Sequence, residues 1–193
     1  MSMDLIKKLR NATGAGMNDC HLALKENNND YDLACEWLRK RGQKIASKKQ
    51  DRQIKAGLIE SYIHPGGQVG VLLEVGCETD FVARNEDFKI FVHEVALQIA
   101  ATAPQYVSPE DIPTEILEKE KEIYRAEMAD QNKPTEIVEK IIMGKLEKFY
   151  QINCLLKQLY IKDDSMTMEK MLVDVTAKIG EKIVLSKFTR YAI

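Results

Sequence analysis

The first fifty residues repeat apolar side chains at the three- and four-residue intervals of an amphipathic helix. Three such stretches follow one another, with apolar positions Leu5, Ile6, Leu9 and Ala12, then Cys20, Ala23 and Leu24, then Leu33, Ala34, Trp37 and Leu38. Two glycines in residues 13–16 break the first helix, because glycine tolerates backbone angles that other residues avoid. We expect Asn18 and Asp30 to cap the second and third helices. We expect Gly42 to end the third.

From residue 58 the apolar period changes from helical to alternating. Apolar side chains occupy every second position of residues 69–75, and Pro65-Gly66-Gly67 precedes them, which predicts a β-hairpin. The helical period then returns, with apolar positions Phe88, Phe91, Val92, Val95, Ala96 and Ile99. Pro104 ends this helix, since proline lacks a backbone N–H donor.

The remainder of the chain predicts three further helices and two strands. A strongly charged helix covers residues 114–130, and a second helix follows Pro134. Residues 154–161 read as a strand, and the pattern after it predicts a helix from Thr167 to Gly180 and a last strand at residues 182–191.

These elements indicate an α+β fold class, because strands and helices neither alternate strictly nor separate to the two ends of the chain. We expect an N-terminal three-helix domain with a basic connector at residues 1–52. Residues 53–193 would form a core in which helices pack on a small antiparallel sheet.

Composition fits a folded protein of a reducing compartment. Hydrophobic residues make up 45% of the chain and charged residues 30%, and the net charge of −2 argues against a surface that is basic throughout. The four cysteines have no C-x-x-C spacing, so we expect buried thiols rather than a zinc site or disulfides. The chain opens without the apolar run of a signal peptide, and no stretch is long enough to span a membrane. We therefore expect a cytoplasmic protein without a membrane partner.

The sequence lacks the motifs of enzymes and of bound cofactors. The glycines of residues 13–16 are followed by Met17-Asn18-Asp19, where a phosphate-binding loop needs Lys and Ser or Thr. Hydrolase, zinc-protease and kinase signatures are absent, and the three histidines lack metal-ligand spacing. Cys20 and His21 are neighbours on a helix and point about 100° apart, so they do not readily form a nucleophile and base. We expect neither an enzyme nor a requirement for a cofactor or metal.

One basic stretch keeps a nucleic-acid-binding alternative open. From Arg39 to Lys55 the chain carries eight Lys or Arg residues against the single acid Asp51. Phosphate neutralisation needs such a cluster, but the stretch lacks aromatic residues on which bases would stack. A solvated linker helix explains the same charges, and we expect no nucleic-acid partner.

Residues 78–85 combine chemistry that is unusual for a connection between a strand and a helix. The segment reads Glu-Thr-Asp-Phe-Val-Ala-Arg-Asn, and the last residue suits the cap of the helix that follows. Loop residues ordinarily stay polar, so a phenylalanine and a valine beside an acid point to a binding site. The alternative is that Phe81 and Val82 both fold back onto the hairpin or the next helix.

Residues 79–85 also resemble a signature of the translation elongation factor Ts family. A second similar block runs from Leu9 to Leu24 and contains Thr-Gly-Ala-Gly-Met, and a third spans residues 133–150. The similarity covers the chain in order from about Leu5 to its end. It corresponds to the short form of the family, which carries one core unit where longer relatives have two.

This resemblance implies a ubiquitin-associated-like N-terminal domain and a partner, the GTPase elongation factor Tu. The implied activity is guanine-nucleotide exchange in translation elongation, a step of protein biosynthesis. Asp80 and Phe81 would insert near the partner's magnesium and phosphate site, with Thr79 and Val82 beside them. The second block implies that Arg10 and Met17 dock on the same partner domain.

The chain departs from the family pattern in two places. Asn18 stands where many relatives have a second methionine, so the resemblance assigns it no part in the docking contact. Residues 157–161 read Lys-Gln-Leu-Tyr-Ile where relatives usually read Gln-Pro-Phe-Val, so the local backbone is open there.

Two further alternatives concern partners. The three-helix domain of a generic adaptor would bind ubiquitin-like proteins and leave the segment around Phe81 idle. A possible homodimer would use the charged helix at residues 114–130, whose sparse apolar edge is Leu117, Tyr124 and Met128. The same edge is explained by a solvated helix that lies on its own core.

Overall fold

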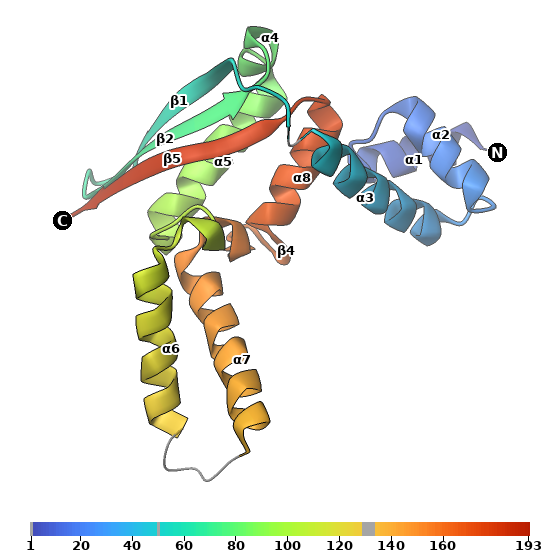
Figure 1. Ribbon diagram of the computed structural model, residues 1–193. Coiled ribbons are helices and arrows are strands. Elements are labelled where there is room, and N and C mark those ends of the chain that lie inside the picture. Colours follow the sequence, from blue (N-terminus) through green and yellow to red (C-terminus); the bar gives the residue numbers. More distant parts are fainter. Residues whose placement is uncertain (1, 50, 129–133) are drawn as a thin grey trace. The chain divides into compact units, whose positions relative to one another are not determined.

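Figure 1 shows a computed structural model of the chain, which describes residues 2–49, 51–128 and 134–193. The chain divides into two compact units. Unit 1 consists of Met1–Glu60, Glu74–His93 and Lys170–Leu185, and unit 2 of Ser61–Leu73, Glu94–Glu169 and Ser186–Ile193. Several helices and strands contribute residues to both units. The predicted domain boundary after residue 52 stays a prediction.

Three helices open unit 1, as predicted, and they are blue to teal in Figure 1. They are α1 (Met3–Thr13), α2 (Met17–Glu26) and α3 (Tyr31–Lys48). Their shared core consists of Ile6, Leu9, Cys20, Ala23, Leu24, Ala34 and Leu38. Asp30 caps α3, because its Oδ1 accepts the Leu33 N–H at 2.9 Å. Gly14 ends α1 at φ 69°, a left-handed conformation that favours glycine.

Three local predictions for these helices were wrong. The residue that caps α2 is Gly16, so Asn18 lies within the first turn instead of capping it. Leu33 is 51% exposed and lies outside the core stripe. Gly42 does not end α3, which continues to Lys48. A side-chain carbon at Gly42 would lie 3.3 Å from Ala177 Cβ, so this glycine permits close contact with α8 (Met168–Ile179).

The sheet has three strands in the order β1 (Ala56–Ile63), β2 (Val69–Cys77) and β5 (Ile183–Ala192). The His64 N–H donates to Val69 O at 2.9 Å across the predicted hairpin turn. The Ile193 N–H donates to Gln68 O at 3.0 Å, so the end of β5 lies beside the start of β2 and the two strands are antiparallel. The α+β class with a small antiparallel sheet is therefore confirmed.

Helix α5 (Glu86–Thr102) supplies much of the buried apolar surface of the sheet region. Its six predicted core positions, Phe88, Phe91, Val92, Val95, Ala96 and Ile99, are all buried. In unit 1, His93 Nδ1 lies 2.9 Å from Glu60 Oε1 of β1. In unit 2, Arg190 Nε of β5 donates to Ala100 O at 3.1 Å. These two hydrogen bonds hold α5 beside the sheet.

Unit 2 contains a helical hairpin of α6 (Thr114–Met128) and α7 (Thr135–Asn153), which lie side by side in Figure 1. Ion pairs join them, with Arg125 Nε 3.5 Å from Glu139 Oε1 and Lys145 bonded to Glu127. The predicted apolar edge at Leu117, Tyr124 and Met128 is half-buried. Residues 129 and 130, which we predicted to continue α6, and Lys133 lie outside the described residues.

The predicted strand at residues 154–161 was wrong over most of its length. A 3-10 turn covers Leu155–Lys157, and only β3 (Leu159–Tyr160) is extended, paired with β4 (Asp163–Thr167). The buried Gln98 explains this, because its Nε2 donates to Leu159 O at 3.1 Å and its Oε1 accepts the Ile161 N–H at 2.9 Å. A side-chain amide thus takes backbone groups that a longer strand would pair. Among the described helices, none has the length and apolar character needed to cross a membrane.

We predict that Gly42→Val lowers the free energy of unfolding by about 1–3 kcal/mol, since overpacking a tight contact costs this much. Gly144→Val is the matched control, because Gly144 lies within α7 and has no atom within 4 Å of an added carbon. Urea denaturation of both variants measures the difference. Equal stability of the two variants would contradict the close contact between α3 and α8.

Candidate functional site

The predicted segment after β2 forms a single helical turn, α4 (Asp80–Ala83), before α5 begins. Phe81 is 83% exposed, whereas Val82 is only 9% exposed. Adjacent helical residues point about 100° apart, so one side chain faces solvent while its neighbour faces the interior. The alternative in which both side chains fold back is therefore wrong, because Val82 is buried and Phe81 is not.

Caps on both sides define this turn. Thr79 is the N-cap of α4, with an extended backbone and an Oγ1 that accepts the Val82 N–H at 3.4 Å. Asn85 then caps α5 as predicted, because its Oδ1 accepts the Asp87 N–H at 2.8 Å. An isolated helix of four residues is unstable in water, since its one or two hydrogen bonds do not offset the ordering of the backbone. The turn therefore needs support from elsewhere in the chain.

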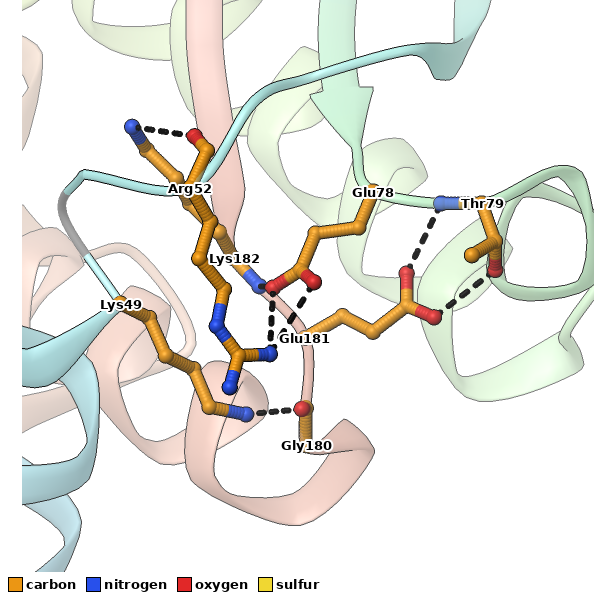
Figure 2. A network of polar contacts seen from close by, with 7 residues as sticks. All are labelled: Lys49, Arg52, Glu78, Thr79, Gly180, Glu181 and Lys182. Carbon is orange, nitrogen blue, oxygen red and sulfur yellow. Dashed lines mark hydrogen bonds and ion pairs between the residues drawn. The ribbon is translucent and has the colours of Figure 1, made fainter.

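Glu181 supplies that support, as Figure 2 shows. Its Oε1 accepts the Thr79 hydroxyl at 2.8 Å, and its Oε2 accepts the Thr79 backbone N–H at 3.0 Å. One carboxylate thus takes both donors of the N-cap residue. The Cys77 thiol adds a third contact, donating to Thr79 O at 3.1 Å, and burial raises the pKa of this thiol so that it keeps its proton.

Glu78 ties the same segment to two others (Figure 2). Its Oε1 accepts the Lys182 backbone N–H at 2.6 Å, and its Oε2 lies 3.1 Å from Arg52 Nη1. Burial alone would raise the pKa of Glu78, but the hydrogen bonds from Lys182 and Arg52 outweigh it, and the pKa is lowered. The carboxylate is therefore held in its charged form.

Two lysines complete the network in Figure 2. Lys182 Nζ donates to Arg52 O at 3.1 Å, and Lys49 Nζ donates to Gly180 O. Burial is the main cause that lowers the pKa of Lys49, followed by the nearby charge of Arg52. Lys49 and Arg52 are thus joined to the segments at residues 78–79 and 180–182, at the N-terminal end of α4.

Asp80, the acid beside the exposed ring, has a different environment. Its Oδ2 lies 3.1 Å from Arg84 Nη2, and the two side chains are 61% and 79% exposed. An ion pair this exposed contributes about 0–1 kcal/mol to stability. The Asp80 carboxylate can therefore leave Arg84 and bind another group at little cost. Over the part of the chain that the structure describes, no group of three His, Cys, Asp or Glu side chains is arranged to hold a metal ion.

Arg10 lies in the last turn of α1, and Met17 is the first residue of α2, so the loop at residues 14–16 lies between them. Arg10 is exposed, and its backbone oxygen accepts the Gly14 N–H at 2.7 Å. Met17 begins α2 and is half-buried against the three-helix core. Lys178 of α8 contacts both this loop and the first turn of α5. Its Cδ would lie 3.4 Å from a side-chain carbon at Gly14, and its Nζ lies 2.8 Å from Asp87 of α5.

The sequence prediction missed the residues that hold the turn. Glu78 was within the segment that drew attention, but an acid before a Thr carries no motif. Glu181 follows the glycine that ends α8 and lies 102 positions from Thr79, so no spacing in the sequence connects the two residues. Lys49 and Arg52 belonged to the basic stretch, where they resembled solvated charges.

Comparison with known proteins gives consistent results. The family model described as Elongation factor TS matches residues 11–193. Elongation factor Ts of Moorella thermoacetica is 53% identical over 188 residues, which cover 97% of this chain and 93% of that protein. Elongation factor Ts of Thermotoga maritima is 53% identical over 100% of this chain and 96% of its own length. The protein of that name from Caldanaerobacter subterraneus is 50% identical over 99% and 96%.

The lowered pKa of Glu78 predicts an acid-sensitive site. A carboxyl group whose pKa is lower in the folded chain than in the unfolded chain adds stability above its unfolded pKa. That stability is lost as the pH falls through the folded pKa, here below the ordinary value of 4.5. Glu78→Gln should cost about 1 kcal/mol at pH 7, the difference between charged and neutral hydrogen bonds, and progressively less as the pH falls below 4.5.

Urea denaturation at a series of pH values between 3 and 7 measures this difference. Glu86→Gln is the control, because the exposed pair of Glu86 with Lys89 contributes little. A Glu78→Gln variant that lost stability with acid as steeply as the unaltered chain would exclude this role for Glu78.

Proposed function

This chain belongs to the elongation factor Ts family, and from that premise we propose that it is a guanine-nucleotide exchange factor for elongation factor Tu. It would act in the cytoplasm, during translation elongation, by promoting GDP release. The factor would make and break no covalent bond. Its binding energy would instead weaken the partner's hold on the nucleotide.

The observation that carries this proposal is the exposed ring of Phe81 on a helical turn whose N-cap is held by hydrogen bonds. The ring is 83% exposed although phenylalanine is among the side chains most often buried in folded proteins. A rigid ring with two rotatable bonds loses little conformational entropy when it enters a pocket. The proposed action is insertion of Phe81 near the partner's magnesium and phosphate site.

Exchange follows from the reciprocity of coupled binding. If binding of the factor lowers the affinity of elongation factor Tu for the nucleotide, then the nucleotide must lower its affinity for the factor by the same ratio. Burial of the Phe81 ring is worth roughly 1.5–3 kcal/mol, and each 1.4 kcal/mol changes an equilibrium constant about tenfold. A ring that fits only the nucleotide-free partner would therefore lower nucleotide affinity by about ten- to a hundredfold.

Asp80 would act beside the ring through its charge. Magnesium takes oxygen ligands, so a carboxylate delivered next to the ion's shell competes with those ligands or with the groups that hold them. Replacing Arg84 by a group of elongation factor Tu beside the Asp80 carboxylate would cost little, because the Asp80–Arg84 ion pair is exposed. Thr79 and the buried Val82 would contribute indirectly, by holding the turn.

We assign docking on the same partner domain to Arg10 and Met17, on the three-helix domain proposed at residues 1–52. Arg10 offers an exposed guanidinium, which binds carboxylates with fixed geometry. The half-exposed Met17 offers a flexible apolar side chain. These contacts would add binding energy that a single ring does not supply.

Several cations of the basic stretch have partners within the chain, which favours exchange over nucleic-acid binding. Lys40 pairs with Glu36 at 2.8 Å, Arg41 with Asp19 at 3.0 Å, and Arg52 with Glu78 at 3.1 Å. A phosphate backbone would have to displace these acids, and of the three acids Glu78 is the least exposed, so the Arg52 pair is the most costly to break. A homodimer remains a proposal, and of the α6 edge considered for it the Tyr124 ring contacts α7, with its centroid 5.2 Å from Lys145 Nζ.

We predict that Phe81→Ala slows GDP release from elongation factor Tu by about ten- to a hundredfold, with stability nearly unchanged because the ring is exposed. Stopped-flow fluorescence of labelled GDP measures the rate. Tyr191→Ala, which removes another exposed aromatic ring, should release GDP at the unaltered rate. Normal exchange by Phe81→Ala would refute the insertion mechanism.

Arg10→Ala should weaken binding more than it slows release from the bound complex, since Arg10 docks without touching the nucleotide site. The concentration of factor that gives half the maximal release rate should rise about five- to tenfold, the usual effect of losing one charged contact. The maximal rate itself should change less. Lys25→Ala is the charge-matched control on α2, and the reverse pattern for Arg10→Ala would exclude docking.

A further inference from the structure

Among the residues drawn in Figure 2, Glu181 is the one whose side chain contacts Thr79, the N-cap of α4. Its two carboxylate oxygens accept two donors of Thr79, the hydroxyl at 2.8 Å and the backbone N–H at 3.0 Å. Two hydrogen bonds to one residue fix its orientation as well as its position. The Thr79 backbone, from which α4 starts, therefore has a defined direction.

The backbone around Glu181 is itself held on both sides. Gly180 O accepts a hydrogen bond from Lys49, and the Lys182 N–H donates to Glu78 at 2.6 Å. Gly180 has φ 82°, so the chain turns sharply out of α8 at this point. The carboxylate thus extends from a segment that is fixed before and after it, which makes it a rigid support.

The Phe81 ring cannot set its own direction, because at 83% exposure it has few contacts within the chain. Its direction depends on the turn, and the turn depends on the Thr79 cap and on the buried Val82. Side chains that must be ordered during binding reduce the energy left for affinity. A cap held in advance removes that cost at the ring.

We propose that Glu181 is a positioning residue for nucleotide exchange, which orients the Phe81 ring by holding both donors of Thr79. This inference rests on the proposed function, since it assigns Glu181 a part in the same step. The proposed role requires no contact of Glu181 with the partner or with the nucleotide. It acts only through Thr79 and the turn.

The test combines Glu181→Gln with Phe81→Ala. Glutamine has nearly the same shape, but its amide nitrogen is a donor and cannot accept from Thr79. In the unaltered chain Glu181→Gln should lower the maximal rate of labelled-GDP release from elongation factor Tu by about five- to tenfold. In the Phe81→Ala background the same change should have no further effect, because the ring that it orients is gone.

Each result has one meaning. Equal fold-losses in the two backgrounds would overturn the proposal, since Glu181 would then act independently of the ring. The proposal would also be overturned by unchanged release in the Glu181→Gln single variant. Normal exchange by Phe81→Ala alone would instead refute the insertion mechanism, and a lack of GDP release by the unaltered chain would refute the proposed function. Glu169→Gln, which removes a carboxylate paired with Lys157 in unit 2, is the matched control and should leave the rate unchanged.

A second pair of variants covers the case in which Glu181→Gln does not fold, as judged by circular dichroism and urea denaturation. Thr79→Val removes the hydroxyl and keeps the backbone N–H, whereas Thr79→Ser keeps both donors. Thr79→Val should lower the maximal rate about threefold in the unaltered chain and leave it unchanged in the Phe81→Ala background. Thr79→Ser should restore the rate, and a serine variant as slow as the valine variant would contradict the proposal.

Discussion

The hydrogen bonds between Thr79 and Glu181 are the constraint on which the site depends. Helix α4 has four residues, too few to be stable by itself, and it carries an exposed ring that adds almost no packing. Two oxygens of one carboxylate hold its first turn in place of the missing helical length. The remaining contacts in Figure 2 keep that carboxylate where it is needed.

Periodicity predicted the elements of this fold where local pattern and packing agree. The apolar stripe of α5 is buried at each predicted position, and the hairpin follows from alternation around Pro65-Gly66-Gly67. The pattern failed where a distant residue decides the outcome. Gly42 is typical of a helix end. Here it lies inside a continuing helix, because its lack of a side chain permits the close contact with Ala177. Gln98 likewise shortens the strand at Leu159 from sixty-one positions away.

The site residues also divide into those that the local pattern predicts and those that depend on distant parts of the chain. Thr79, Asp80 and Phe81 drew attention because an apolar pair beside an acid is unusual in a connection, and the family signature covers the same residues. The pattern could not say whether Phe81 and Val82 share one environment, since this depends on a single helical turn that eight residues do not specify. Glu181 was beyond prediction, because a hydrogen bond between residues 79 and 181 leaves no trace in spacing or composition.

An apolar ring that must be both exposed and fixed presents a physical conflict. Packing is what normally fixes a phenylalanine, and packing would bury it. The chain separates the two requirements between neighbouring residues. Val82 holds the turn by its buried side chain, and Thr79 holds it by hydrogen bonds. Phe81, which lies in the same turn, therefore needs no contacts of its own. The polar anchor at Thr79 adds direction to the burial of Val82, because hydrogen bonds are directional and here act on the backbone.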